Sequence, residues 1–140
     1  MSLERRVYPR AKIKWPVKVK TDKGSMDGVT SDLTPNGVFI HCQKPLRLNV
    51  VFEMIIKIPN SEQSLEAKAE VVWSNRWGPD DEISPRGMGV RFVKISSEAR
   101  KFIARTTLHH LKSKEVAPEL LRTLQTLVID TKKEDDSKAA

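Results

Sequence analysis

The sequence predicts a mainly β protein, an antiparallel barrel of six or seven strands followed by C-terminal α-helices. Three observations predict this fold class. Short segments of alternating apolar and polar residues follow one another, turn residues separate them, and no helical periodicity lies between them. Helical periodicity begins only after Ser96. With 140 residues, the chain is long enough to bury the core of one domain without disulfides or a metal.

The first strand is predicted from Ala11 to Thr21, where apolar and basic residues alternate strictly. Such alternation is typical of a strand with one buried and one solvated face. The apolar face is Ile13, Trp15, Val17 and Val19, and the basic face is Lys12, Lys14, Lys18 and Lys20. Because Pro16 has no N–H to donate, we expect this strand to lie at an edge of the sheet or to carry a bulge.

Five more strands follow, each bounded by turn residues. They are predicted at Met26–Ser31, Val38–Cys42, Val50–Ile58, Leu65–Trp73 and Met88–Ile95. Alternation marks two inward faces, Phe52, Met54, Ile56 and Ile58 in one strand and Leu65, Ala67, Ala69, Val71 and Trp73 in another. Pro35 and Gly37 suit the corner and the end of a type I turn. The loop from Asn75 to Arg86 is predicted to be a solvated connection, and Trp77 within it is left undecided.

Two helices are predicted after the strands. Ser96 or Ser97 caps the first, which runs to about Lys112. One apolar stripe consists of Ala99, Phe102, Ile103 and Thr106, with Leu108 and Leu111 on the other side. The second begins at Pro118 and carries Leu120, Leu121, Leu124, Leu127 and Val128 on one face. We expect this face to pack on the first helix within a monomer; a homodimer through the same face is the alternative.

Charge and cysteine usage narrow the function classes. The net charge is +7, and most of the excess lies in residues 1–23. A positive field attracts any polyanion, so charge alone does not distinguish a dinucleotide, RNA or an acidic membrane surface as the partner. Cys42 is the single cysteine, so an intrachain disulfide is excluded. This favours the reducing cytoplasm, as does the lack of a signal peptide or an apolar run that could span a bilayer.

Two short motifs carry most of the functional information. The first places Arg6 and Arg10 four residues apart, with Arg5 directly before them. The second, from Asp32 to Gly37, supplies a carboxylate, a hydroxyl and a glycine in the pattern Asp-x-Thr-x-x-Gly. A guanidinium group can bind phosphate bidentately, hydrogen-bond guanine O6 and N7, or stack on a purine, whereas lysine does only the first well. Together the motifs suit a planar, dianionic nucleotide.

Both motifs resemble the signature of the PilZ family of bacterial cyclic di-GMP receptors, Arg-x-x-x-Arg and Asp/Asn-x-Ser-x-x-Gly. The likeness extends to Gly37–Ile40 and Gly87–Val93, and it covers roughly Glu4 to Leu111. It implies a PilZ-type barrel that binds cyclic di-GMP. The implied ligand-binding residues are Arg5, Arg6, Arg10, Asp32, Thr34, Gly37 and Trp73. Thr34 departs from the family's serine: it keeps the hydroxyl and adds a methyl group.

Each candidate residue has a structural alternative. The arginines could be a solvated terminus, Asp32 and Thr34 could cap a turn, and Trp73 could fill the core as part of an inward stripe. In the functional interpretation, Asp32 accepts from guanine N1 and N2 or orients an arginine. Thr34 hydrogen-bonds phosphate or base, and Gly37 lets the backbone come close to the ligand. An arginine at position 5 implies, from the family, two cyclic di-GMP molecules per chain.

These features divide the chain into four segments. They are a flexible basic arm at residues 1–10, the barrel and its helix at 11–113, a C-terminal helix at 114–130 and a disordered tail at 131–140. Because the arm holds the arginine motif, its ordering should be coupled to ligand binding. Trp15 is expected in the core.

The predicted function is a receptor and adaptor that signals to a downstream protein. No enzyme motif is present, so no catalytic residue, metal or cofactor is expected. His41 and Cys42 point to opposite faces of a strand and cannot form a dyad. Membrane insertion and nucleic-acid binding are not expected. The alternatives are a barrel that binds single-stranded nucleic acid through the lysine face, and a PilZ-like interaction module without the ligand.

Overall fold

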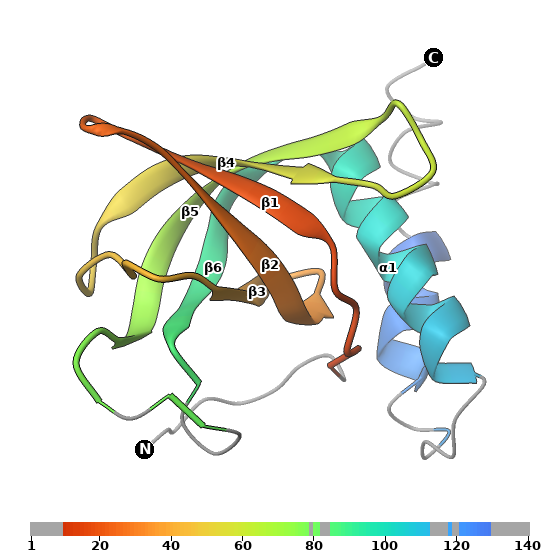
Figure 1. Ribbon diagram of the computed structural model, residues 1–140. Helices are drawn as coiled ribbons and strands as arrows, with labels where there is room; N and C mark the ends of the chain where they lie inside the picture. The colour runs from red at the N-terminus through yellow and green to blue at the C-terminus, as the bar shows by residue number, and fades with distance from the viewer. Residues whose placement is uncertain (1–9, 79, 82–84, 113–117, 119–120, 130–140) are drawn as a thin grey trace.

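Six strands form a closed antiparallel barrel in the computed structural model, which describes residues 10–78, 80–81, 85–112, 118 and 121–129 (Figure 1). The strands are β1 (Pro16–Thr21), β2 (Gly24–Thr34), β3 (Gly37–His41), β4 (Val51–Lys57), β5 (Ser64–Asn75) and β6 (Gly87–Ile95). Their order around the barrel is β1-β2-β3-β6-β5-β4. Pairing of β1 with β4 closes the sheet, so none of these six strands is left at an edge. The predicted fold class is confirmed, with six strands.

Alternate apolar residues of the strands fill the inside of the barrel. Val19, Ile40, Met54 and Val71 come from four different strands, and each is at most 1% exposed. The inward face predicted for Val50–Ile58 is therefore confirmed, because Phe52, Met54 and Ile56 are all buried. The charged residues of β1, β4 and β5 lie at outward positions.

The first strand is shorter than predicted, because regular pairing starts at Pro16 and not at Ala11. Ala11 forms only an isolated bridge with Leu33, and the Trp15 N–H donates to Thr30 Oγ1 at 2.8 Å. Pro16 is the first residue of β1, and pairing with β4 begins at Val17. A proline is tolerated there because no ladder hydrogen bond needs its nitrogen. The prediction of an edge strand or a bulge at Pro16 is therefore wrong.

Helix α1 (Ser97–Lys112) begins as predicted, with Ser96 Oγ accepting a hydrogen bond from the Ala99 N–H at 3.1 Å. Its buried residues are Ala99, Ile103, Ala104, Thr107 and Leu111. The predicted stripe is thus partly wrong: Thr107 replaces Thr106, and Leu111 shares the buried face. The reason is that α1 packs against the barrel and also against the following helix, which widens the buried face.

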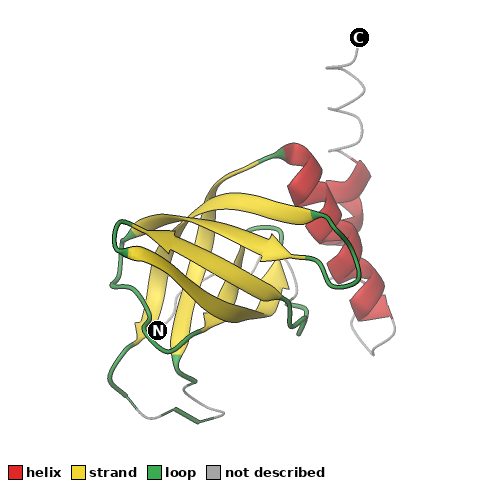
Figure 2. Ribbon diagram, turned by 45° about the horizontal axis from the view of Figure 1, so that its top comes forward, coloured by secondary structure: helices red, strands yellow, loops and turns green. Residues whose placement is uncertain are grey.

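A second helix covers residues 121–129 and lies alongside α1 (Figures 1 and 2). Leu124 is fully buried in the common core, and Leu121, Leu127 and Val128 pack against that core. The predicted packing of the leucine face within the chain is therefore seen for the described residues. Leu120 lies outside them, as do residues 1–9 of the predicted arm and all of the predicted tail.

Candidate functional site

The turn from Thr34 to Gly37 is held by the Thr34 hydroxyl. Its oxygen accepts hydrogen bonds from the backbone N–H groups of Asn36 and Gly37, each at 3.1 Å. The hydroxyl also donates to the Gly37 carbonyl oxygen at 3.3 Å. A serine could make the same three bonds, so the methyl group of Thr34 changes nothing in the turn. The structural alternative, a hydroxyl that caps the turn, is therefore realised for Thr34.

Asp32 stands in a bulge of β2. The pairing with β3 shifts between Ser31 and Thr34, and Asp32 has a φ of 48°, in the left-handed region that aspartate tolerates better than most residues. This bulge sends Leu33 into the core, where it is fully buried, and leaves Asp32 partly exposed. Among the described residues, nothing forms an ion pair or hydrogen bond with its carboxylate. Asp32 therefore does not cap the turn.

An isolated bridge between Ala11 and Leu33 joins the segment that follows Arg10 to the Asp32 motif. The Ala11 N–H donates to the Leu33 carbonyl at 3.1 Å, and the Leu33 N–H donates to the Ala11 carbonyl at 2.8 Å. Ala11 is fully buried, so this crossing is part of the core. Arg10 is exposed and directly precedes it, so the arginine enters the fold next to the Asp32 bulge. Arg5 and Arg6 lie outside the described residues.

Gly37 is required by a neighbouring strand. A Cβ at this position would lie 2.2 Å from the Val90 carbonyl oxygen of β6, far inside contact distance. We expected this glycine to let the backbone approach a ligand, but the approach that the structure shows is that of β3 to β6. At Gly89, by contrast, a Cβ would come no closer than 3.6 Å to its neighbours.

Trp73 lies on the outer face of the barrel, where 44% of it is exposed. Its pairing with β6 jumps from Val71–Val90 to Trp73–Gly89, so Val72 is an extra residue in β5. Such a bulge interrupts the alternation of faces and turns the indole out of the inward stripe. The interpretation of Trp73 as core filler is therefore wrong.

An aromatic strip forms around Trp73 and includes two residues that the sequence analysis missed. The ring of Phe39 lies 5.6 Å from that of Trp73 and 4.9 Å from that of His41. Gly89 sits between Phe39 and Trp73 in the sheet register and leaves space over the strand. Gly37 is two residues from Phe39 on the same strand, so the strip extends toward the Asp32 turn. Only the register, which a single sequence does not display, reveals this grouping.

Arg91 is a further cation at this site that sequence reasoning did not single out. It pairs with Gly37 in the β3–β6 register. Its guanidinium Nε donates to the Glu70 carboxylate at 2.7 Å, while 57% of the side chain remains exposed. The outer face near the turn thus combines one free-standing carboxylate, aromatic surface and guanidinium groups. That combination can bind a phosphorylated purine.

Other chemistry finds little support in the described residues. Cys42 is 7% exposed, and burial raises the pKa of its thiol to about 11, so it stays protonated and unreactive at neutral pH. No group of three His, Cys, Asp or Glu side chains in the described part of the chain could hold a metal ion. No described helix is both long and apolar enough to cross a membrane.

Comparisons with known proteins agree with this picture. The family model of the PilZ domain matches residues 4–108. The motility inhibitor MotI/DgrA of Bacillus subtilis has a similar structure, with a TM-score of 0.65 and 17% identity over 81% of this chain. The chain spans 54% of that protein's length. The PilZ domain of YcgR from Escherichia coli, solved with c-di-GMP, gives a TM-score of 0.52 and 13% identity over 97% of both chains. No match was found among curated proteins.

Proposed function

Because this chain belongs to the PilZ domain family, we propose that it binds cyclic di-GMP on the outer face of the barrel, beside the Asp32 turn. PilZ domains are receptor and adaptor modules, and a PilZ domain of similar fold was solved with this ligand. The observation that carries the proposal for this chain is the bridge between Ala11 and Leu33. The bridge places the described end of the arginine motif, Arg10, beside the Asp32 motif, although the two are far apart in the sequence.

The proposed roles rest on the chemistry of each side chain. Arg10, with Arg5 and Arg6, binds phosphate and the guanine O6 and N7 atoms through bidentate hydrogen bonds. The Asp32 carboxylate accepts from guanine N1 and N2 on the Watson–Crick edge of the base. Thr34 and Gly37 stabilise the turn that follows Asp32 and so help to fix the position of its carboxylate.

Trp73 and the neighbouring Phe39 provide the apolar part of the proposed site. Trp73 is 44% exposed although it is a large apolar side chain, and a purine face would cover it. Arg5 supports a second ligand molecule, because an extra guanidinium offsets the charge of two more phosphates. We therefore propose two cyclic di-GMP per chain, with the arginine segment ordering over them as they bind.

The protein then acts as a cytoplasmic receptor without catalysis, which passes the signal to a downstream protein as a monomer. The alternative of single-stranded nucleic acid on the lysine face has less support. Lys12, Lys14 and Lys20 are exposed, but Trp15 nearby is packed on Phe102 with ring centroids 6.3 Å apart. Single-stranded nucleic acids bind to proteins largely by stacking their bases on exposed aromatic rings. Lys14→Ala and Lys18→Ala should therefore leave ligand binding unchanged.

Calorimetric titration tests the proposal, with cyclic di-GMP, cyclic di-AMP and GTP as separate ligands. We expect saturable binding of cyclic di-GMP only. Adenine lacks the N1–H and N2 donors that would meet Asp32, so cyclic di-AMP should bind at least tenfold more weakly, a difference of about 1.4 kcal/mol. Equal binding of all three, or steep salt dependence without base preference, would contradict the proposal and favour nucleic acid.

A further inference from the structure

The end of the barrel opposite the Asp32 turn carries a second exposed surface, built from three connections. They are the β1–β2 turn at residues 22–23, the β3–β4 connection at residues 42–50 and the loop after β5 at residues 76–78. Strand β2 has 11 residues and runs from the β1–β2 turn of this surface to the Asp32 turn, roughly 30 Å of extended chain. Strand β3, which links the Asp32 turn to the β3–β4 connection, has five residues.

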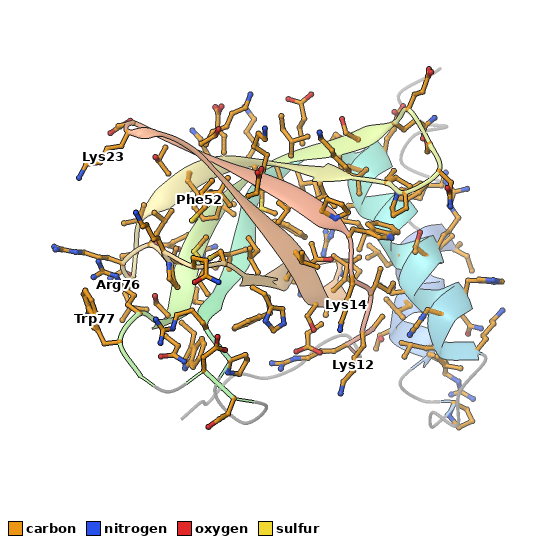
Figure 3. All side chains as sticks on the ribbon, viewed as in Figure 1. Lys12, Lys14, Lys23, Phe52, Arg76 and Trp77 are labelled. Carbon is orange, nitrogen blue, oxygen red and sulfur yellow. The ribbon has the colours of Figure 1, made fainter. Side chains whose placement is uncertain are left out.

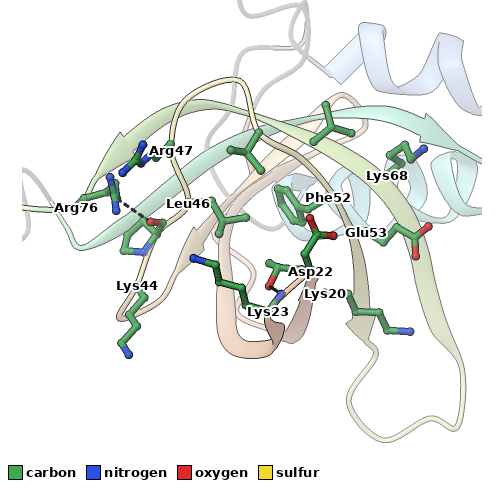
Figure 4. A pocket seen from close by; sticks show the side chains of 14 residues that line it. Lys20, Asp22, Lys23, Lys44, Leu46, Arg47, Phe52, Glu53, Lys68 and Arg76 are labelled. Carbon is green, nitrogen blue, oxygen red and sulfur yellow. Dashed lines mark hydrogen bonds between the residues drawn. The ribbon is translucent and has the colours of Figure 1, made fainter.

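Positive charge gathers in a basin at this end. The basin has a volume of about 880 Å³ and is open to solvent. Its charged lining consists of six cations, Lys20, Lys23, Lys44, Arg47, Lys68 and Arg76, and two carboxylates, Asp22 and Glu53. Figure 4 shows Arg47 and Arg76 at one end of the basin and Lys68 at the other. An excess of four positive charges in a concave surface attracts and orients an acidic partner.

Exposed apolar side chains adjoin the basin. Trp77 is 84% exposed, more than any other large apolar residue in the described part of the chain, and Leu48 is 57% exposed. Both line a shallow depression with Arg47 and Arg76. The Arg76 guanidinium lies over the Trp77 ring at 5.0 Å from its centroid, and Figure 3 shows the two side chains together. Tryptophan and arginine are the residues most enriched among those that dominate the binding energy of interfaces.

The loop that presents Trp77 is fixed by hydrogen bonds. The Gly78 N–H donates to Asn75 Oδ1 at 3.0 Å, and Arg86 Nη2 donates to the Gly78 carbonyl at 2.6 Å. Arg76 Nε donates to the Pro45 carbonyl at 3.2 Å, which joins this loop to the β3–β4 connection. The earlier interpretation as a merely solvated connection is therefore incomplete. An apolar side chain held in place before binding loses less entropy when a partner covers it.

We propose that this surface docks an acidic protein segment with an apolar anchor residue. Carboxylates of the segment pair with the cations of the basin, and the anchor packs between Trp77 and Leu48. A single-stranded nucleic acid fits less well, because it needs successive stacking platforms, and Trp77 is the only exposed aromatic ring among the described residues that line this surface. The identity of this segment as part of a downstream target rests on the proposed function. The binding of an acidic segment to this surface does not.

A fluorescent peptide of glutamates around a central Leu-Phe pair tests the proposal by anisotropy, with the full chain and no nucleotide. We expect binding that weakens with salt. Trp77→Ser and Lys44→Glu should each weaken it about tenfold, near 1.4 kcal/mol. Matched controls are Ile129→Ser, another exposed apolar residue, and Lys12→Glu, another exposed cation. Both should bind the peptide as wild type does.

Several results would overturn the proposal. They are an absence of peptide binding, wild-type affinity in Trp77→Ser and Lys44→Glu, and a preference of this surface for oligothymidylate over the peptide. Cyclic di-GMP calorimetry on Trp77→Ser keeps the two proposals separate, because we expect it to match wild type. A chain that binds the peptide but not cyclic di-GMP would refute only the receptor function.

Discussion

The two ends of the barrel differ in how they expose charge. At the Asp32 end, a partly exposed carboxylate and an exposed arginine lie where a bulge and an isolated bridge interrupt the regular sheet. At the other end, six cations line a basin that adjoins the exposed Trp77. Charges of both signs suit a small ligand with both donors and acceptors. A broad surface of positive charge suits a larger acidic partner. The barrel can therefore bind the nucleotide at one end and a protein partner at the other.

Removal of an arginine should cause the largest loss of cyclic di-GMP affinity and should leave peptide binding at the other end unchanged. We expect Arg6→Ala or Arg10→Ala to abolish cyclic di-GMP binding, because each loses bidentate contacts, while the melting temperature stays nearly unchanged. Lysine should not substitute. Calorimetry and thermal melts check this, with Lys12→Ala as the matched exposed cation. Near wild-type affinity in both arginine variants would show that residues 1–10 are not part of the cyclic di-GMP site.

Substitution of Gly37 should destabilise the packing of β3 against β6 at the Asp32 end. Gly37→Ala places a Cβ against the Val90 carbonyl, so the free energy of unfolding should fall by about 3 kcal/mol. Gly89→Ala is the matched control on β6, because its Cβ has ordinary contacts, and it should stay within about 1 kcal/mol of wild type. Denaturant unfolding measures both. Equal stability of the two variants would show that β3 can move away from β6.

Loss of the free carboxylate should have a smaller effect on binding. We expect Asp32→Ala to weaken cyclic di-GMP binding by about 1–3 kcal/mol, because a guanine edge loses its acceptor. The substitution also puts alanine at a φ of 48°, so Asn60→Ala, at a φ of 60°, controls for backbone strain. Asn60→Ala should lose stability without losing affinity. Equal affinity losses in both variants would assign the effect to the backbone.

The smallest change concerns stoichiometry. Arg5→Leu should bind one cyclic di-GMP per chain where wild type binds two, because the guanidinium that bridges to the second molecule is lost. Calorimetry well above the dissociation constant counts the ligands. One ligand per wild-type chain would refute the role of Arg5 and leave the assignment of the site intact.

The alternation of residues was sufficient to predict the barrel and its inward faces, as the buried residues of β4 demonstrate. The motif from Asp32 to Gly37 likewise predicted a turn, which the Thr34 hydroxyl holds. Bulges could not be predicted, because one extra residue such as Val72 shifts cross-strand register without a signal in the local sequence. For the same reason, the exposure of Trp73 and its contact with Phe39 were out of reach. The hydrogen bonds that fix the loop carrying Trp77 depend on tertiary contacts of Arg86 and Asn75.

The indole N–H signals of the three tryptophans give the most direct test of which end binds the nucleotide. Trp73 lies on the aromatic strip near the Asp32 turn, Trp77 lies at the opposite end, and Trp15 is packed on Phe102. In a nitrogen-15 NMR titration with cyclic di-GMP, we predict that the Trp73 signal shifts and saturates while the Trp77 signal stays in place. A shift of Trp77 without Trp73, or no shift of either with cyclic di-GMP in excess, would contradict the assignment of the nucleotide to the Asp32 end.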